Sequence, residues 1–287
     1  MITTQVEGLY AVIPTVHGQS RVRKLLLEIT KSNIVPEGIV VVDNHPGAKN
    51  CRFEIQGFEN VTLIQHNDFL GTAHAFFIGI VEAVRQGSST VWLLDDDTLL
   101  WEDSLQEMVA VLRRASSNKI IIAPNTNNSN AGLAILGKGL LPFRLPNLPI
   151  ESPELVPWSG MLISDPRKAL PFFEELGHIY WWSWDDYALC KRLLDLADYQ
   201  IATVPTARLG QPKSKDPVRW KEYYSVRNGV LFGIYELTGY SRWRFLCSFI
   251  ITTVILRKYR RGWLSWRLRA VLDAFYGKIG KQILPKY

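Results

Sequence analysis

The hydrophobic pattern of the chain alternates between two kinds of segment, and this alternation predicts the fold class. Short apolar runs at 9–13 and 38–43 predict buried strands. Between them, segment 21–32 places apolar residues on one helical face, at Val22, Leu25, Leu26 and Ile29. A strand, a helix and a second strand in this order form a βαβ unit, which builds a parallel sheet.

The same alternation continues along the chain. It predicts further strands at 61–64, 91–94, 119–123, 158–164 and 201–204, and helices at 71–85, 102–115, 186–196 and 217–237. A turn is expected at 208–210, and long loops at 125–130 and 141–157. The chain is thus expected to be a Rossmann-like α/β protein with a mostly parallel central sheet flanked by helices. It lacks a GxGxxG between its first two strands, so the usual dinucleotide fingerprint is absent.

Three carboxylates follow the strand predicted at 91–94. Asp95, Asp96 and Asp97 come directly after Val-Trp-Leu-Leu, and ligands of open α/β sheets bind at the carboxyl ends of strands. Adjacent anions repel each other by roughly 1 kcal/mol per pair at about 4–6 Å unless a cation lies among them. Mg²⁺ or Mn²⁺ is the simplest candidate. The structural alternative is that one aspartate caps the following helix.

Other acidic residues extend this candidate site. Asp43 ends the second predicted strand, and Asp185 and Asp186 stand among aromatic residues. Aromatic rings stack on sugars, and a carboxylate can take the proton from an attacking hydroxyl. A metal held by one or two carboxylates takes its other oxygen ligands from phosphates. We therefore expect a nucleoside-diphosphate substrate.

Small residues open the helix predicted at 71–85. Gly71, Ala73 and Ala75 would let a ligand approach the helix start closely, or they would serve helix–sheet packing. Both interpretations are open at the level of the sequence.

The basic residues are concentrated near the C-terminus. The net charge is +6, and eleven of the 33 Lys and Arg residues lie from Arg242 onward, against one of the 27 acidic residues, Asp273. The rest of the chain is therefore mildly acidic. Nucleic-acid binders usually spread basic and aromatic residues over the folded body, so we expect no nucleic-acid partner.

Tryptophans lie among these basic residues, at Trp243, Trp263 and Trp266. Tryptophans and cations on a helix with an apolar side are typical of helices that lie in the plane of an anionic membrane surface. We therefore predict a basic amphipathic helical tail over 241–287 that binds such a surface. The alternative is a helical hairpin packed on the domain or on another subunit, which leaves a homo-oligomer open.

The chain shows no export or membrane-spanning segment. Residues 1–7 lack the features of a secretion signal, and the longest uncharged apolar run, 245–256, is too short to span a bilayer. Cys51, Cys190 and Cys247 lie far apart, which predicts reduced thiols. We expect a cytoplasmic protein that touches a membrane from the cytosolic side.

Several short motifs occur in a fixed order. They are Pro14-Thr15, Val42-Asp43-Asn44, the run from Gly71 to Gly79, Leu94 to Thr98, Ser159-Gly160 and Trp184-Asp185-Asp186. Together they resemble the motifs of family 2 inverting glycosyltransferases with the GT-A fold. Arg219, Tyr223-Tyr224 and Arg227-Asn228 are similar to a signature of the bacterial rhamnosyltransferase and galactofuranosyltransferase branch. The resemblance covers about residues 8–280.

This resemblance implies a reaction and its main residues. The donor would be UDP-galactofuranose or dTDP-rhamnose, and the triple aspartate favours galactofuranose. Asp43 would contact the pyrimidine base, and Asp95 and Asp97 would form the DxD pair, with Asp97 as the metal ligand. Asp186 would be the base of a single in-line displacement, and Asp185 would contact hydroxyls of the acceptor or donor. Asp96 would contact the donor sugar or cap a helix.

The resemblance also assigns the remaining binding residues. Thr15, Asn67 and Gly71 would contact the donor nucleotide. The acceptor, a lipid-linked bacterial glycan, would meet Trp158, Gly160, Trp181, Trp182 and Trp184. Many relatives have a metal-binding His after the last strand, but residues 204–211 contain none. Arg208 or Gln211 would instead face the diphosphate, and the third metal ligand has no candidate.

The resemblance also implies a domain division and a location. Residues 1–240 would form the catalytic domain, with nucleotide binding in 1–115 and acceptor binding in 116–240. Residues 241–287 would bind the inner face of the bacterial cytoplasmic membrane. One alternative is a nucleotidyltransferase, but Pro14 to Gly18 contains no Lys or Arg. Another is an inactive sugar- or nucleotide-binding module, against which the intact acids Asp97 and Asp186 argue.

Overall fold

The computed structural model of the chain describes residues 4–16, 21–45, 55–115, 117–126, 156–210, 218–256 and 263–283. Within these ranges, eight strands form one sheet in the order β3-β2-β1-β4-β7-β6-β8-β5. The strands are β1 (Thr4–Thr15), β2 (Ile34–Asp43), β3 (Val61–Gln65), β4 (Thr90–Leu93), β5 (Leu99–Leu100), β6 (Ile120–Thr126), β7 (Leu162–Ser164) and β8 (Gln200–Gly210).

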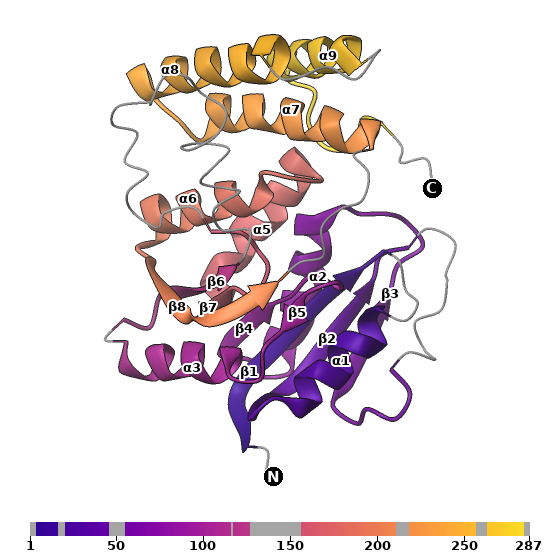
Figure 1. Cartoon of the computed structure of the whole chain (residues 1–287), viewed down its shortest axis with the longest axis vertical. Coiled ribbons are helices and arrows are strands. Elements are labelled where there is room, and N and C mark those ends of the chain that lie inside the picture. Colours follow the sequence, from indigo (N-terminus) through magenta and orange to yellow (C-terminus); the bar gives the residue numbers. More distant parts are fainter. Residues whose placement is uncertain are drawn as a thin grey trace.

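Helices cover both faces of this sheet and form a further layer beyond it (Figure 1). They are α1 (Arg21–Lys31), α2 (Thr72–Arg85), α3 (Ser104–Arg114), α5 (Pro166–Tyr180), α6 (Asp185–Ala197), α7 (Arg219–Tyr235), α8 (Gly239–Ile250), the π-helix η3 (Ile251–Leu256) and α9 (Trp263–Phe275). The α/β prediction is confirmed.

The central strands contain continuous apolar runs, at 9–13 in β1 and 39–42 in β2, because both faces of these runs are buried. Ala11 and Ile13 of β1 pack with α1 and α3, whereas Tyr10 and Val12 pack with α2 and α5. Successive side chains of a strand point to opposite faces, so a strand covered on both sides must be a continuous hydrophobic run.

The sheet is mixed in direction. β1 pairs in parallel with β2 and β4, β2 with β3, and β6 with β8. The pairs β4–β7, β6–β7 and β5–β8 are antiparallel. The parallel portion therefore contains the strand ends at which the acidic residues were predicted, and β7 runs against its neighbours.

Some predicted elements differ in the structure. The turn predicted at 208–210 is wrong, because Leu209 and Gly210 pair with the unpredicted strand β5 and extend β8. Helix α5 was not predicted, although its buried positions have helical spacing, because Pro171 lies inside it and proline normally breaks helices. The loop predicted at 125–130 begins inside β6, and 127–155 lies outside the described residues.

The C-terminal helices form a layer in which α7 contacts both α8 and α9. Helices α8 and α9 therefore pack on α7, as expected for the alternative of a helical hairpin packed on the domain. No helix in the described part of the chain has the length and hydrophobicity needed to cross a bilayer. The domain division at residue 240 remains a prediction.

Candidate active site

The predicted acidic residues meet at the edge of the sheet where β1, β2 and β4 end. Thr15 and Asp43 are register partners at the ends of β1 and β2, and Thr15 Oγ1 donates a 2.6 Å hydrogen bond to Asp96 Oδ2. Because β1 lies between β2 and β4, Asp43 and Asp95 do not end neighbouring strands. Thr15 connects the two acidic positions instead.

The aspartate cluster, Asp95 to Asp97, lies in the turn after β4. The N–H of Thr98 closes this turn by donating to the carbonyl of Asp95 at 3.1 Å. The following helix, α3, begins at Ser104 after Asp103. The alternative that an aspartate of the cluster caps this helix is therefore wrong, and the cluster is left for another role.

Two cationic side chains act on the cluster. Arg21 Nη1 lies 3.7 Å from Asp96 Oδ1 and 3.6 Å from Asp97 Oδ2. Burial and the charge of Asp96 raise the pKa of Asp97, while Arg21 and Lys221 oppose this rise. Neither cation had a predicted role. A signal existed for Arg21, the first basic residue after β1, and Lys221 stands within the predicted signature around 219–228.

The cluster fits a hard divalent cation. Carboxylate oxygens are the preferred ligands of Mg²⁺ and Mn²⁺, and burial together with the neighbouring charge of Asp96 disfavours the ionised form of Asp97 in the absence of a cation. Among the described residues, no group of three or more His, Cys, Asp or Glu side chains is arranged to hold a metal ion by itself. A cation held by Asp95 and Asp97 and completed by substrate phosphates needs no such group.

The second acidic pair begins helix α6. Asp185 is fully buried, and burial raises its pKa to about 6, although the Trp158 indole and the Ala73 amide act in the opposite direction. Asp186 is half-buried. Its pKa is raised well above the ordinary carboxyl value by burial, and then by the charges of Asp185 and Asp95.

The effect of Asp95 on the pKa of Asp186 indicates that the two residues lie near each other. The two residues are far apart in the sequence, yet the charge of one raises the pKa of the other. One charge shifts the pKa of another mainly when the two groups lie near each other in the structure. The cluster after β4 and the acidic pair of α6 therefore lie in one site.

The start of α2 lies against the segment that precedes α6. Gly71 has φ +88°, and a Cβ there would lie 2.1 Å from the carbonyl oxygen of Trp181. That carbonyl accepts a 2.9 Å hydrogen bond from the N–H of Thr72. Ala73 and Ala75 are fully buried in the core, so they serve packing, and only Gly71 is needed for a close backbone approach.

Most of the residues predicted to meet the acceptor are buried. Trp158 packs between Phe76 and Phe173, while Trp181, Trp184 and Gly160 are also inaccessible. Among the five, Trp182 alone is partly exposed, and Lys221 Nζ lies 5.6 Å from the centre of its ring. An acceptor role for this set remains a prediction, and Trp182 is its accessible member.

Two other predicted residues lie at the surface. Asn67 and Arg208 are exposed, and the backbone carbonyl of Arg208 accepts a hydrogen bond from Ser104 Oγ. Their contacts with a donor nucleotide remain predictions. Gln211 lies outside the described residues, as do residues 141–155 of the loop predicted at 141–157.

Comparison with solved structures defines the class of fold. The mannosyltransferase PcManGT from Pyrobaculum calidifontis, solved with GDP-Man and Mn²⁺, has a TM-score of 0.60 at 12% identity, covering 94% of this chain and 87% of that one. TarS from S. aureus scores 0.58 at 13% identity, covering 93% and 80%. The glucosyl-3-phosphoglycerate synthase of Mycobacterium tuberculosis, solved with Mn²⁺ and UDP, scores 0.55 at 13% identity, covering 81% and 80%. The chain therefore has the GT-A fold, as predicted.

Sequence comparison finds a relative that matches part of the chain. Galactofuranosyltransferase GlfT1 of Mycobacterium tuberculosis is 30% identical over 93 residues, which are 32% of this chain and 31% of the relative. The match thus spans less than a third of the relative's length. No family model matches the chain.

Proposed function

We propose that the chain is a metal-assisted inverting glycosyltransferase that moves a sugar from a nucleoside diphosphate to an acceptor hydroxyl. The observation that carries this proposal is the influence of Asp95 on Asp186, which joins two acidic groups at one edge of a GT-A sheet. One group suits a cation and a diphosphate. The other offers a carboxylate with a raised pKa, which can take up a proton.

Asp97 and Asp95 are the proposed ligands of Mg²⁺ or Mn²⁺. When bound, such an ion neutralises the negative charge that develops on the departing diphosphate. Arg21 and Lys221 act on Asp97 and would add positive charge on the same side. Asp43, at the end of β2, would contact the pyrimidine base.

Asp186 is the proposed general base. Its carboxylate accepts the proton of the acceptor hydroxyl while that oxygen forms a bond to the anomeric carbon. The bond from this carbon to the diphosphate breaks on the opposite side, and its electron pair leaves with the nucleoside diphosphate. Attack and departure on opposite sides invert the anomeric configuration.

The proposed donor is UDP-galactofuranose, with dTDP-rhamnose as the second candidate. The local similarity to a galactofuranosyltransferase and the run of three aspartates support the first. The proposed acceptor is a lipid-linked glycan of the kind used for bacterial cell-surface polysaccharides.

Nucleotide binding tests the metal-diphosphate part of this proposal. We expect UDP to bind the wild-type protein at least about tenfold more tightly with Mn²⁺ than with EDTA, because the cation bridges carboxylates and phosphates. Asp97→Ala should remove most of this difference, whereas Asp198→Ala, at the far end of α6, should keep it. Titration calorimetry measures all three. Equal UDP affinity with and without Mn²⁺ in the wild type would contradict the proposed metal role.

We also propose that the protein binds the inner face of the bacterial cytoplasmic membrane through its C-terminal helices. Helix α9 buries two charged side chains, Arg267 and Asp273, at 2% and 5% exposure, and it packs against α7. Its outer face exposes apolar side chains to 42–55%, namely Leu264, Leu268, Leu272 and Phe275. An exposed apolar stripe of this kind marks an interaction surface.

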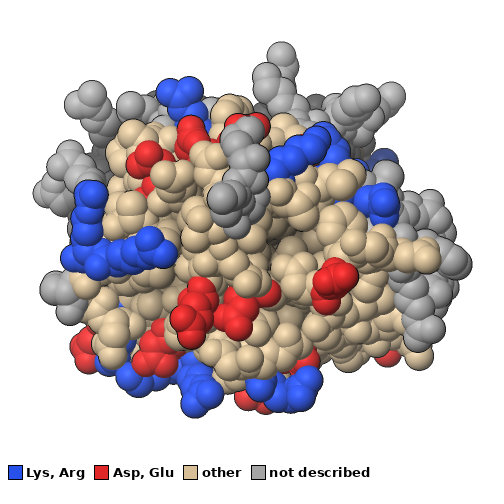
Figure 2. Space-filling view, turned by 90° about the horizontal axis from the view of Figure 1, so that it is seen from below, with Lys and Arg blue, Asp and Glu red and all other residues tan. Residues whose placement is uncertain are grey.

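Charge supports a membrane as the partner of this stripe. Arg269 and Lys278 are exposed on and next to this helix, and the tail holds eleven of the 33 Lys and Arg residues against one acidic residue, so it carries the net positive charge of the chain. The opposite end of the molecule instead mixes basic and acidic side chains (Figure 2). Trp263 and Trp266 face inward, although they were predicted to lie at the membrane surface. The exposed leucines of α9, together with the exposed Trp243, would contact the membrane instead.

A further inference from the structure

The segment that leads into the proposed base has an unusual backbone. Trp181, Ser183 and Trp184 have φ angles of 52°, 68° and 70°, and they are three of the five non-glycine residues with positive φ in the described part of the chain. The N–H of Trp182 donates to the carbonyl of Tyr180, which makes a tight γ-turn around Trp181. Each such residue costs on the order of 1–3 kcal/mol and persists only where its surroundings hold it.

Asn228 of α7 provides much of this restraint. Its side chain is fully buried, and Nδ2 faces the carbonyl oxygens of Tyr180, Trp182 and Ser183 at 2.5, 2.6 and 3.0 Å. Three carbonyls that point at one amide nitrogen are drawn toward a common centre. The turn is therefore shaped around this single side chain.

Arg227 fixes the orientation of the Asn228 amide. Arg227 Nε donates a 2.9 Å hydrogen bond to Asn228 Oδ1, and because a guanidinium only donates, the amide oxygen must face it. Arg227 is itself buried, lies 4.7 Å from the ring centre of Tyr224 and donates through Nη1 to Gly280. The amide nitrogen is thereby directed at the turn.

A second contact from α7 holds the end of the turn. Trp184 Nε1 donates a 2.9 Å hydrogen bond to the carbonyl of Ser225, and the Trp184 ring packs on Phe232. Trp184 is the N-cap residue of α6, so Asp185 and Asp186 follow it directly. The position of α7 thus sets where the first turn of α6 begins.

We infer that Asn228 is a positioning residue, which holds the turn 180–184 in the shape that places Asp186 against the aspartate cluster. The inference rests on the proposed function, because Asp186 is the proposed base. A displacement of about 1 Å at a reacting group can reduce a rate by about 100-fold. Loss of the Asn228 donors should therefore affect the chemical step more than donor binding.

Asn228→Asp tests this role with little change in shape. The carboxylate still accepts from Arg227 but turns an acceptor toward three carbonyls. We expect kcat for release of UDP from UDP-galactofuranose, with an alkyl glycoside as acceptor, to fall by about 100-fold. The KM for the donor should stay within about threefold, because the hydrogen bonds of Asn228 go to Arg227 and to the turn and not to Asp43 or the aspartate cluster. Asn228→Ser, which retains one short donor, should recover part of kcat.

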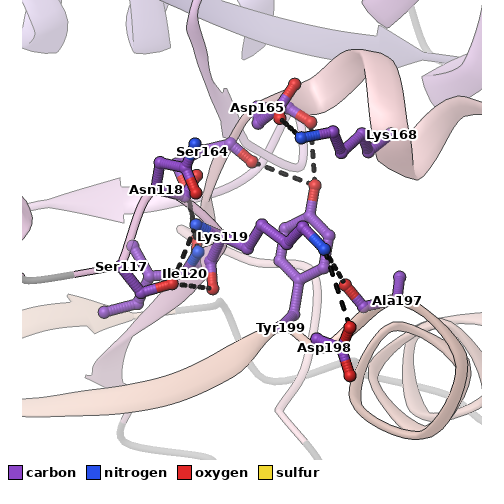
Figure 3. Close-up of polar contacts among 10 residues, drawn as sticks. All are labelled: Ser117, Asn118, Lys119, Ile120, Ser164, Asp165, Lys168, Ala197, Asp198 and Tyr199. Atoms are coloured by element: carbon purple, nitrogen blue, oxygen red, sulfur yellow. Dashed lines mark hydrogen bonds and ion pairs between the residues drawn. The ribbon is translucent and has the colours of Figure 1, made fainter.

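Tyr199→Phe is the matched control, because it removes a side-chain donor that is likewise shared between backbone carbonyls. Tyr199 donates to Ser164 and Asp165 at 3.1 and 2.8 Å (Figure 3), at the end of the sheet where β4 begins and away from Asp95. Tyr199→Phe should lower the melting temperature by about as much as Asn228→Asp does, and it should leave kcat within about twofold of the wild-type value. Equal losses of kcat in the control and in Asn228→Asp would overturn the positioning role, as would a normal kcat in Asn228→Asp.

Hydrogen exchange separates this inference from the proposed function. The amides of 181–187 should exchange at least about tenfold faster in Asn228→Asp than in the wild type, and at the wild-type rate in Tyr199→Phe. If the wild type released no nucleotide from any UDP- or dTDP-sugar, the proposed function and the positioning role would both fall. Unchanged exchange in Asn228→Asp would overturn the restraint itself, whatever the activity.

Discussion

At the scale of single residues, the chemistry of the candidate site depends on the protonation state of Asp186. Burial and the charges of Asp185 and Asp95 raise its pKa, so its carboxylate binds a proton more readily than one exposed to water. Burial and the charge of Asp185 raise the pKa of Asp186 whether or not a cation neutralises Asp95. A base with this property is suited to taking a proton from a hydroxyl.

The raised pKa predicts the pH dependence of the reaction. A general base acts only when it is deprotonated, so kcat/KM should rise with pH through the titration of the Asp185–Asp186 pair and then level off. Because the pKa of Asp185 is raised to about 6 and that of Asp186 also lies well above its ordinary value, activity should be largely lost at pH 5. Measurement of kcat/KM between pH 4.5 and 9 tests this, and a flat profile down to pH 4.5 would contradict it.

The residues of the site differ in how far the sequence could predict them. The acids that follow strands and the acids beside tryptophans were recognisable, because carboxylates in such positions are chemically unusual. Arg21 and Lys221 act on the cluster from α1 and α7; their positions in the sequence were noticeable, but neither position shows that the side chain points toward the acidic residues. The burial of Trp158 and Trp181 likewise follows from packing between elements that are distant in the sequence.

At the scale of elements, α9 shows how tertiary contacts determine which face of a helix is exposed. Its charged residues Arg267 and Asp273 contact Glu222 and Tyr223 of α7, and its leucines are left outside. The sequence predicted an amphipathic tail but placed its tryptophans on the membrane side. The spacing of apolar residues alone could not show which face of α9 is exposed, because both faces contain apolar residues.

The leucine face of α9 predicts the membrane behaviour of the protein. Replacing Leu264, Leu268 and Leu272 together with Gln should abolish co-sedimentation with vesicles of phosphatidylglycerol and phosphatidylcholine, since the apolar area that enters the interface is lost. Leu196→Gln, at an exposed leucine of α6, should leave binding unchanged. Wild-type binding should weaken as salt is raised. Undiminished binding of the triple variant would show that the stripe does not contact lipid.

At the scale of the whole molecule, the sheet brings together residues from opposite halves of the chain. The cluster after β4 and the pair at the start of α6 are about ninety positions apart, and the shared edge of the sheet makes them neighbours. The alternation of strands and helices was enough to predict the fold class. The strand order was not, because it places β1 between the two acidic strand ends and reverses β7, and neither follows from local periodicity.

The most direct test of the central claim is to remove the proposed base and measure binding and transfer separately. In Asp186→Asn, release of UDP from UDP-galactofuranose in the presence of an alkyl glycoside should fall by at least about 100-fold, the usual contribution of a positioned base. The Kd for UDP with Mn²⁺ should stay within about threefold, because the aspartate cluster remains intact. Asp198→Asn, at the other end of the same helix, should behave as the wild type. Sustained transfer by Asp186→Asn would contradict the account.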